Sequence, residues 1–515
     1  MNGADALMQT LVNSGTGICF ANPGTTEMHL VAAIDRTEGM RAVLGLFEGV
    51  VTGAADGWGR MTGRPAATLT HLGPGFANGL ANLHNARRAR TPIVNLVGDH
   101  ATYHVGLDAP LTSDIESLAR PMSIWVRTAT DAGSLPKDGA EAVAGALSPP
   151  GGPATLIVPS DTAWNEASGL HAPVTPQAFE PVESRIVDLT AQALKKARNP
   201  VLLLGSSAVT PDALEAAGRI AAATGARLIR DTFISRIGRG AGRITPEVFS
   251  YFPESALDQL KDCDLMVIAG TRPPIAFFAY RDTPGSLVPE GCETVTLAGV
   301  KADAPGALEA LADALKAPAE PAQRQKLEKP GLASGNELTS EAVGQTIAQL
   351  LPEGTIVSDE GTTAGIWTSI ATTGAEAHEW LQLTGGAIGQ GLPLAAGAAL
   401  ACPDRKVLCI HGDGGAMYTV QALWTMAREK LDVVNVIFSN RSYAILSLEL
   451  MRADTGNAGP KALSMFDLSN PEITWPKLAE SMGVNASRAE TVDDFNRQLA
   501  DALRTKGPHL IEAVV

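Results

Sequence analysis

The chain has 515 residues, a length that predicts about three domains. Because 45% of the residues are hydrophobic and only 18% are charged, we do not expect long disordered tails. A formal net charge of −15 argues against a nucleic-acid partner, because binding to phosphate backbones requires clustered Lys and Arg side chains. The five cysteines lack CxxC spacing, and we see neither a signal peptide nor a membrane-spanning apolar run, so we expect a cytoplasmic protein with reduced thiols and no membrane partner.

Residues 1–165 alternate between apolar runs and helical segments, which predicts a first domain with a parallel sheet covered by helices on both faces. The predicted strands cover residues 17–21, 42–47, 66–71, 92–97 and 154–158. Glu48 stands at the end of the second strand and precedes a helix of small residues at 49–60. Taken alone, Glu48 is an acid in the first turn of a helix, where the helix dipole favours it.

Residues 180–330 show the same alternation and predict a middle α/β domain. Its predicted strands cover residues 201–205, 226–229 and 265–269, and a helix is predicted at 212–225. No GxGxxG motif follows a strand in this segment, so we do not expect FAD. Residues 317–335 are rich in Pro, Ala, Glu and Lys and predict a linker to a third domain at 336–515.

A βαβ unit in the third domain contains the most informative motif. Residues 407–410 and 433–438 are apolar strands, and residues 420–430 between them have helical spacing. Asp413 and Asn440 therefore lie at the carboxyl ends of adjacent parallel strands, the edge at which open α/β sheets bind ligands. Their oxygens suit Mg²⁺, and the glycines beside Asp413 let backbone N–H groups approach a phosphate. This unit can hold a magnesium-bridged diphosphate.

Gly412-Asp413-Gly414, followed after a helix and a strand by Asn440, resembles the diphosphate-binding motif of thiamine diphosphate enzymes. The resemblance implies that Asp413, Asn440 and the main-chain carbonyl of Ser442 bind Mg²⁺. It covers nearly the whole chain and is closest to benzoylformate decarboxylase and to proteins like the acetolactate synthase large subunit. It implies three doubly wound parallel-sheet domains, of which the first binds the pyrimidine of the cofactor and the third binds its diphosphate.

Other segments extend this resemblance to the rest of the cofactor site. The stretch EGVVTGAADGWGR, which begins at Glu48, resembles the segment that follows the catalytic glutamate of the family. This implies that the Glu48 carboxylate hydrogen-bonds N1′ of the aminopyrimidine and so promotes removal of the C2 proton. The Gly386 carbonyl would accept a hydrogen bond from the 4′-amino group, and Ile388 would lie beneath the cofactor. The remaining implied cofactor contacts are Asn22, Pro23, Gly24, Gly73, Asn78, Thr362, Thr363, Gly412, Gly414, Gly415, Tyr443, Ala444 and Ile445.

The resemblance also implies catalytic residues on the substrate side. Thr25 lies in a substrate loop that carries a serine in benzoylformate decarboxylase. His71 opens a further active-site loop, HLGPGFAN, although taken alone it could be an ordinary strand-end histidine. Tyr280 takes the place of a second catalytic histidine of the decarboxylase, or it only packs with neighbouring aromatic residues. His100 and His104 are further candidates for which a structural role is the simpler reading.

The resemblance implies decarboxylation of a 2-oxo acid, followed by protonation of the enamine or by its ligation to a second carbonyl. A 2-hydroxy ketone lyase or carboligase that needs no carboxylate is an alternative. A catalytically silent, cofactor-binding homologue is another, and it is favoured by Phe47, where the family often has histidine, and by Tyr280. In the family, the glutamate of one subunit meets the diphosphate motif of another. We therefore expect a homodimer or homotetramer that acts on small 2-oxo acids or aldehydes.

Overall fold

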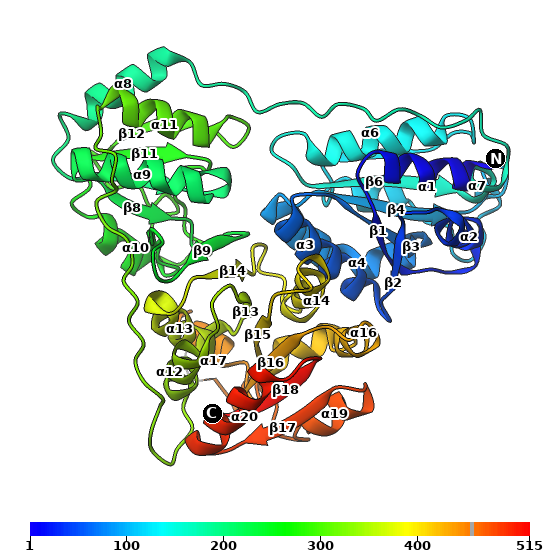
Figure 1. Cartoon of the computed structure of the whole chain (residues 1–515). Helices are drawn as coiled ribbons and strands as arrows, with labels where there is room; N and C mark the ends of the chain where they lie inside the picture. Colours follow the sequence, from blue (N-terminus) through cyan, green and yellow to red (C-terminus); the bar gives the residue numbers. More distant parts are fainter. Residues whose placement is uncertain (454–457) are drawn as a thin grey trace.

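The computed structural model describes residues 1–453 and 458–515 and arranges them around three sheets that are covered by helices (Figure 1). The first and second sheets are entirely parallel, and the third contains one antiparallel strand. This architecture confirms the predicted α/β class with three doubly wound parallel sheets. No helix of the described segments is long and apolar enough to cross a membrane.

The first sheet contains six strands and carries the part of the chain that includes Glu48. The strands lie in the order β2 (Arg41–Leu44), β1 (Ile18–Asn22), β3 (Ala66–His71), β4 (Ile93–Asp99), β6 (Pro153–Pro159) and β5 (Trp125–Thr128). The covering helices include α1 (Gly3–Asn13), α2 (Met28–Arg36), α3 (Glu48–Thr62), α4 (Leu72–Ala89) and α6 (Leu135–Leu147). The sequence pattern missed β5, because each of its four residues is only half-buried and the segment contains no apolar run. The expectation that a loop follows His71 is wrong, because α4 begins at the next residue, where Leu72 has φ +50°.

The second sheet lies in the middle of the chain. Its strands follow the order β10 (Glu247–Val248), β8 (Arg227–Arg230), β7 (Pro200–Leu204), β11 (Leu265–Ala269) and β12 (Glu293–Ala298). Helices that pack on it include α8 (Ser184–Leu194), α9 (Pro211–Thr224), α10 (Pro253–Leu260) and α11 (Ala304–Ala314). Strand β12 was not predicted, because three of its first four residues are exposed and it lacks the apolar run of a buried strand.

The third sheet contains seven strands and carries the predicted βαβ unit. Its order is β17 (Asn485–Ala489), β18 (His509–Val514), β16 (Val433–Ser439), β15 (Val407–Gly412), β13 (Ile356–Glu360), β14 (His378–Gln382) and β9 (Ile237–Arg239). Its helices include α12 (Ser340–Leu350), α13 (Thr362–Ala371), α14 (Gly391–Ala401), α16 (Ala422–Arg428), α17 (Ala444–Arg452), α19 (Trp475–Ser481) and α20 (Val492–Arg504). Strand β9 pairs antiparallel with β14, although it comes from the middle segment. The domain boundaries at 165, 180, 330 and 336 stay a prediction.

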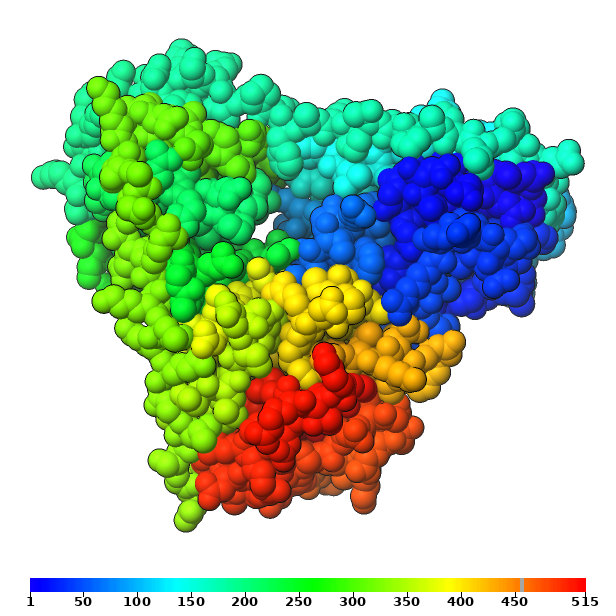
Figure 2. Space-filling model, in the orientation of Figure 1, coloured from blue at the N-terminus to red at the C-terminus, as the bar shows by residue number. Residues whose placement is uncertain are grey.

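The hydrophobic core runs through all three sheets. One buried cluster joins Val50 of α3 to Leu394 of α14 and Ile437 of β16, so it connects the first sheet with the third. A second cluster contains Leu202 of β7 and Ile410 of β15, and it connects the middle sheet with the other face of the third. Figure 2 shows the result, with blue residues of the first segment resting on yellow and orange residues of the third.

Helices α3 and α14 cross in direct backbone contact at the centre of the molecule. A Cβ atom on Gly57 would lie 2.1 Å from the carbonyl oxygen of Leu394, and one on Gly397 would lie 1.9 Å from that of Ala54. Both distances are far below a van der Waals contact, so the crossing requires glycine at both positions. The small residues that follow Glu48 are therefore explained by the close approach of α14.

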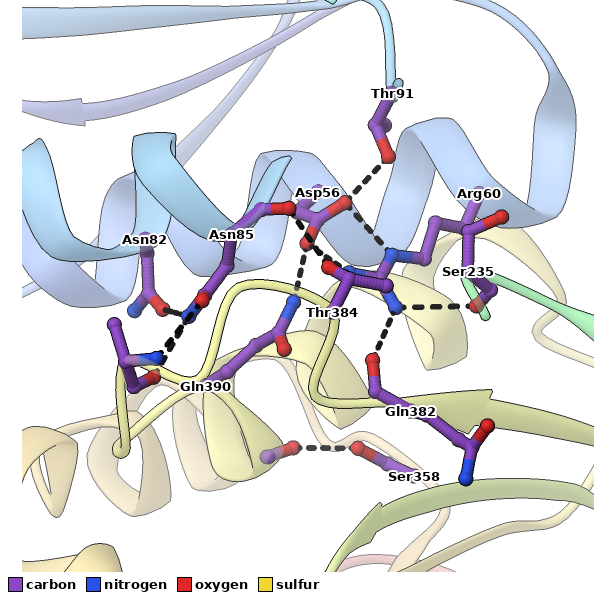
Figure 3. A network of polar contacts seen from close by, with 12 residues as sticks. Asp56, Arg60, Asn82, Asn85, Thr91, Ser235, Ser358, Gln382, Thr384 and Gln390 are labelled. Atoms are coloured by element: carbon purple, nitrogen blue, oxygen red, sulfur yellow. Dashed lines mark hydrogen bonds and ion pairs between the residues drawn. The ribbon is translucent and has the colours of Figure 1, made fainter. Parts of the chain in front are cut away.

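A buried ion pair between Asp56 and Arg60 holds the same crossing together through polar contacts (Figure 3). The Asp56 carboxylate also accepts hydrogen bonds from Thr91 Oγ1 at 2.6 Å and from Gln390 Nε2 at 2.5 Å. Beyond Asp56, the Arg60 guanidinium donates to the main-chain oxygens of Ser235 and Gln382 and to Thr384 Oγ1. One ion pair therefore joins the first segment, the middle segment and the loop that precedes α14.

We predict that Asp56→Ala destabilises the protein by about 3–5 kcal/mol, because it leaves the Arg60 charge buried without its partner. The Arg60 side chain is 1% exposed, so water cannot replace the lost carboxylate. Urea unfolding followed by circular dichroism measures the change. Arg504→Ala is the matched control, because it breaks an exposed pair with Asp501 and should change the free energy of unfolding by less than about 1 kcal/mol. Equal effects of the two substitutions would contradict the prediction.

Candidate active site at the carboxyl ends of the first and third sheets

Glu48 is the first residue of α3 and lies at the carboxyl edge of the first sheet. It is 7% exposed, and its Oε2 accepts a hydrogen bond from Asn78 Nδ2 at 3.0 Å. Strand β2 ends at Leu44, earlier than predicted, and a short connection then leads to Glu48. A buried carboxylate at a helix N-terminus, held by a side-chain amide donor, is well placed to accept a proton from a ligand.

His71 ends strand β3 and is anchored by a buried carboxylate. Its Nδ1 lies 2.8 Å from Oε2 of Glu27, whose side chain is fully buried. Glu27 also accepts hydrogen bonds from the Gly24 N–H at 2.7 Å and from Thr26 Oγ1 at 2.5 Å. Because an ionised carboxylate only accepts hydrogen bonds, Nδ1 of His71 carries the proton in this contact and Nε2 stays available for a substrate. The Glu27 carboxylate therefore fixes the orientation of the His71 imidazole.

The sequence analysis missed Glu27, although a local signal could have revealed it. Glu27 stands three residues after Gly24 at the start of a short 3₁₀ helix, Thr25–Glu27, and its carboxylate bonds back to the Gly24 N–H. A glutamate at this spacing is typical of a helix start. Its second contact, with His71, comes from a strand 44 residues away and has no sequence signature.

The structure brings Glu48 and His71 together around Gly75. A Cβ atom on Gly75 would lie 3.0 Å from Oε1 of Glu48 and 3.3 Å from Cβ of His71, so both side chains border one glycine of α4. The candidate residues Asn22, Pro23, Gly24 and Thr25 lie at the neighbouring end of β1. Gly73 lies slightly apart, where a Cβ would contact Ser113 Oγ at 1.8 Å. The predicted residues of the first domain therefore occupy the ends of three adjacent strands.

His100 and His104 follow β4 at the same edge. Their ring centroids are 5.4 Å apart and tilted by 53°. The N–H of His100 donates to the Asp99 carboxylate at 2.7 Å, and burial raises the pKa of the Asp99 carboxyl above its ordinary value. The two imidazoles contact each other in a tilted arrangement beside the end of β4, and their roles stay a prediction.

Asp413 and Asn440 lie together at the ends of β15 and β16, which are adjacent parallel strands with Gly412 opposite Phe438. The Asp413 carboxylate accepts hydrogen bonds from the N–H groups of Gly414 at 2.8 Å and Arg441 at 2.7 Å. Its second contact therefore reaches the residue directly after Asn440. Burial raises the pKa of the Asp413 carboxyl, so a bound cation would stabilise its ionised form.

The donors in this loop fit a hard cation that is shared with a ligand. Asp413 supplies one carboxylate and Asn440 an amide oxygen, which in the structure accepts from the Ser442 N–H at 3.0 Å. Within residues 1–453 and 458–515, no group of three or more His, Cys, Asp and Glu side chains could hold a metal. Asp413, Asn440 and the Ser442 carbonyl offer three oxygen donors, and a hard cation bound there would need phosphate and water oxygens to complete its coordination.

The segments beside Asp413 form a cradle of backbone N–H groups. Helix α15 (Asp413–Ala416) and helix α13 both begin here, and helix N-termini favour phosphate groups. A Cβ on Gly412 would lie 3.4 Å from Thr362 Oγ1, and one on Gly414 would lie 2.4 Å from the ring of Tyr443. Thr362 itself has φ +48°, a strained conformation that brings its hydroxyl to the glycine loop. Thr363, Gly415, Ala444 and Ile445 lie in the first turns of the surrounding helices.

A buried carboxylate that the sequence analysis did not identify fixes the loop with Gly386 and Ile388. Glu360 is 2% exposed and accepts hydrogen bonds from the N–H groups of Gly389 and Gly391, each at 2.6 Å. Its Oε2 also lies 3.3 Å from Nε2 of the buried His411. The loop is therefore held at Gly389 and Gly391, while Gly386 is half-buried and Ile388 is half-buried as well.

Tyr280 does not lie among the residues around His71 in the described contacts. Its hydroxyl donates to the Glu449 carboxylate, with oxygen–oxygen distances of 3.0 and 3.1 Å. This contact joins the loop at 272–285 to helix α17, and it gives Glu449 a partner that the sequence did not suggest.

Comparison with protein families identifies the class to which this fold and site belong. The N-terminal TPP-binding domain of thiamine pyrophosphate enzymes matches residues 1–118, and the C-terminal TPP-binding domain matches residues 361–513. Together the two matches cover more than half of the chain and include Glu48, His71, Asp413 and Asn440. The chain belongs to the thiamine pyrophosphate enzyme family, and the cofactor of this family is thiamine diphosphate.

Comparison with individual proteins specifies which type of thiamine diphosphate enzyme the chain resembles. A protein of Mycobacterium tuberculosis with the provisional name acetolactate synthase large subunit IlvX is 50% identical over 520 residues, which are 100% of this chain and 99% of that protein. Benzoylformate decarboxylase of Pseudomonas aeruginosa is 29% identical over 98% of this chain and 97% of its own. The solved thiamine diphosphate-dependent 4-hydroxybenzoylformate decarboxylase of Rhodococcus jostii has a TM-score of 0.87 at 26% identity, over 100% of this chain and 99% of its own. The chain is therefore a thiamine diphosphate-dependent enzyme of the acetolactate synthase or benzoylformate decarboxylase type.

Proposed function

We propose that this protein decarboxylates a 2-oxo acid and then releases an aldehyde or joins the remaining fragment to a second carbonyl compound. The observation that carries the proposal is the pairing of a buried Glu48 with the His71–Glu27 couple around one glycine, Gly75. Thiamine diphosphate, when bound, supplies a nucleophilic C2 carbon and accepts the electrons that remain when carbon dioxide leaves. The protein has to place one group that exchanges protons with the cofactor and another that exchanges protons with the substrate.

The chain's own residues divide this work between the two sheets. Asp413, Asn440 and the Ser442 carbonyl would hold Mg²⁺, and the N–H groups of α13 and α15 would surround the diphosphate. The Gly386 carbonyl and the Glu48 carboxylate would each bind a polar edge of the aminopyrimidine. Thr25 and His71 would face the substrate, and the hydroxyl and imidazole there can hold a proton beside the reacting carbonyl.

We also propose that the active unit is a homodimer or a homotetramer in the cytoplasm. The contacts of the Glu48 side chain are with its own domain, and those of the Asp413 carboxylate are with the loops of the third sheet. In this proposal, each half-site is completed by the complementary half of another copy. Helix α13, beside the diphosphate cradle, exposes Ile366, Trp367 and Ile370 by 56%, 44% and 61%, and this apolar surface supports association.

His71→Ala is expected to lower kcat by about 10²–10⁴-fold while the affinity for thiamine diphosphate stays close to that of the unmutated protein, because His71 moves a proton rather than holding the cofactor. Glu27→Gln should lower kcat by about 10-fold with little change in KM, because a neutral amide orients the imidazole less strongly than a carboxylate does. His29→Ala is the control, since His29 lies on the surface against Trp164. Normal turnover of every accepted substrate by His71→Ala would show that His71 is structural.

A panel of 2-oxo acids tests the proposed function directly. The unmutated protein, loaded with thiamine diphosphate and Mg²⁺, is incubated with pyruvate, 2-oxobutanoate and benzoylformate, and released carbon dioxide is measured together with the products by mass spectrometry. An aldehyde product indicates protonation, and a 2-hydroxy ketone product indicates ligation. A protein that consumes 2-hydroxy ketones but no 2-oxo acid is a lyase, and one that binds the cofactor without any turnover is a silent homologue. Either result would overturn the proposal.

A further inference from the structure

A cavity of about 680 Å³ lies between the loop at residues 272–285 and helix α17. The residues that line it include Glu254, Phe278, Tyr280, Arg281, Glu449 and Arg452. Most of them are charged or carry a hydroxyl group, so the cavity is polar. Its role follows from the two segments that border it.

The loop at residues 272–285 and helix α17, which border this cavity, both lie next to residues that we assign to the cofactor site. Phe277, in the loop, would lie 3.3 Å from a Cβ on Gly386, the residue whose carbonyl we assign to the aminopyrimidine. Its ring is fixed by contacts with Phe233 and Tyr251, with centroid separations of 5.6 and 5.2 Å. Helix α17 begins at Ala444, two residues after Ser442. The cavity is therefore bordered by segments that also carry proposed cofactor contacts, and it can take the side chain of a substrate bound there.

Glu449 is the acceptor that this cavity presents. Tyr280 donates its single hydroxyl proton to it, and a carboxylate has about four acceptor sites, so free lone pairs remain. The neighbouring cation, Arg452, is engaged elsewhere: its Nη2 donates to both oxygens of Glu254 at 2.9 and 3.0 Å. The Arg452 guanidinium also lies 4.6 Å from the ring centroids of Tyr280 and Phe252. Tyr280 is thus held from both sides and orients the Glu449 carboxylate.

We infer that Glu449, oriented by Tyr280, determines the substrate specificity of this site and selects 2-oxo acids whose side chain ends in a hydroxyl group or another hydrogen-bond donor. The inference rests on the proposed function and deepens it by naming the substrate class. A donor gains a charge-assisted hydrogen bond to the carboxylate, whereas an apolar side chain displaces water from the lone pairs that Tyr280 leaves free and offers them no donor.

The test compares kcat/KM for two matched pairs of substrates, phenylpyruvate with 4-hydroxyphenylpyruvate and 2-oxobutanoate with 4-hydroxy-2-oxobutanoate. In at least one pair, the unmutated holoenzyme should prefer the hydroxylated member by about 10-fold, the value of one hydrogen bond to a charged group. Glu449→Leu should bring that preference close to one. Tyr280→Phe keeps the carboxylate and should reduce the preference less. The control is Glu290→Gln, an exposed glutamate after the same loop, which should leave the preference unchanged.

Other outcomes separate this inference from the proposed function. If Glu449→Leu turns over 2-oxo acids with the unmutated preference, the inference is wrong while the proposed function holds. If Glu449→Leu and Tyr280→Phe both change KM for all four compounds by one common factor, the Tyr280–Glu449 contact only joins the loop to α17. The inference is then also wrong. If the unmutated protein turns over no 2-oxo acid, the proposed function fails. Calorimetric titration of the holoenzyme with the same pairs then decides the inference, and equal affinities within both pairs overturn it.

Discussion

Glu48→Gln is expected to slow the exchange of the C2 proton of bound thiamine diphosphate by about 10²–10⁴-fold, the usual contribution of a general acid–base group. Glutamine keeps the shape of the side chain and can still pair with Asn78, so the fold and cofactor affinity should change little. It cannot exchange a proton with the aminopyrimidine. Because C2 deprotonation precedes decarboxylation, ligation and cleavage alike, the effect is independent of the substrate. Exchange into D₂O, followed by NMR after acid quench, measures it.

The control for Glu48→Gln neutralises an acidic residue that lies in the first turn of a helix but outside the proposed active site. Asp212→Asn does so, because Asp212 lies in the first turn of α9 and is exposed. It should leave C2 exchange unchanged and alter stability by about 0.3–1 kcal/mol, as expected for an exposed helix-dipole interaction. If Glu48→Gln behaved in the same way, Glu48 would be a helix-start acid and nothing more.

Asp413→Ala is expected to abolish binding of thiamine diphosphate, and chelation of divalent metal should abolish binding to the unmutated protein. The Asp413 carboxylate is the one charged donor in the proposed Mg²⁺ set, and it also accepts the N–H groups of Gly414 and Arg441 that shape the loop. Asp413→Asn keeps the shape without the charge and should weaken binding at least about 10–100-fold. Isothermal titration calorimetry measures all three conditions.

Asp404→Ala controls for the loss of a carboxylate in the same region, because Asp404 is exposed in the connection before β15. Its affinity for the cofactor should equal that of the unmutated protein. Thermal melts of each variant confirm that the fold is retained. Unchanged affinity in Asp413→Ala, or binding that persists when metal is chelated, would refute the proposed metal site.

The sequence predicted elements whose signal is local. The unit from β15 to β16 combines two apolar strands, a turn of glycines and polar residues at both strand ends, so the meeting of Asp413 and Asn440 followed from parallel-strand geometry alone. Likewise, Glu48 begins a helix because a strand precedes it and small residues follow it. Segments such as β5 and β12 lack an apolar run because the structure leaves them at sheet edges, where burial is incomplete.

Contacts between distant segments could not be predicted. Glu27, Glu360 and Glu449 are ordinary acids in the sequence, and each gains its role from a partner on another element: His71, the loop before α14 and Tyr280. Strand β9 shows the same limit, because it pairs with β14 in a register that sets Arg239 opposite His378, 139 residues later in the chain. Long-range pairing depends on the tertiary fold rather than on local periodicity.

The buried Asp56–Arg60 pair has a consequence for how the protein can be divided. The two family-matched parts, residues 1–118 and 361–513, read as separable modules along the chain. In three dimensions Arg60 completes its hydrogen bonds with Ser235 and Gln382, which lie in other parts of the chain. A fragment ending before residue 235 would carry a desolvated guanidinium with unmet donors. The first family-matched part therefore depends on later parts of the chain for the hydrogen bonds of Arg60, and it is not a folding unit of its own.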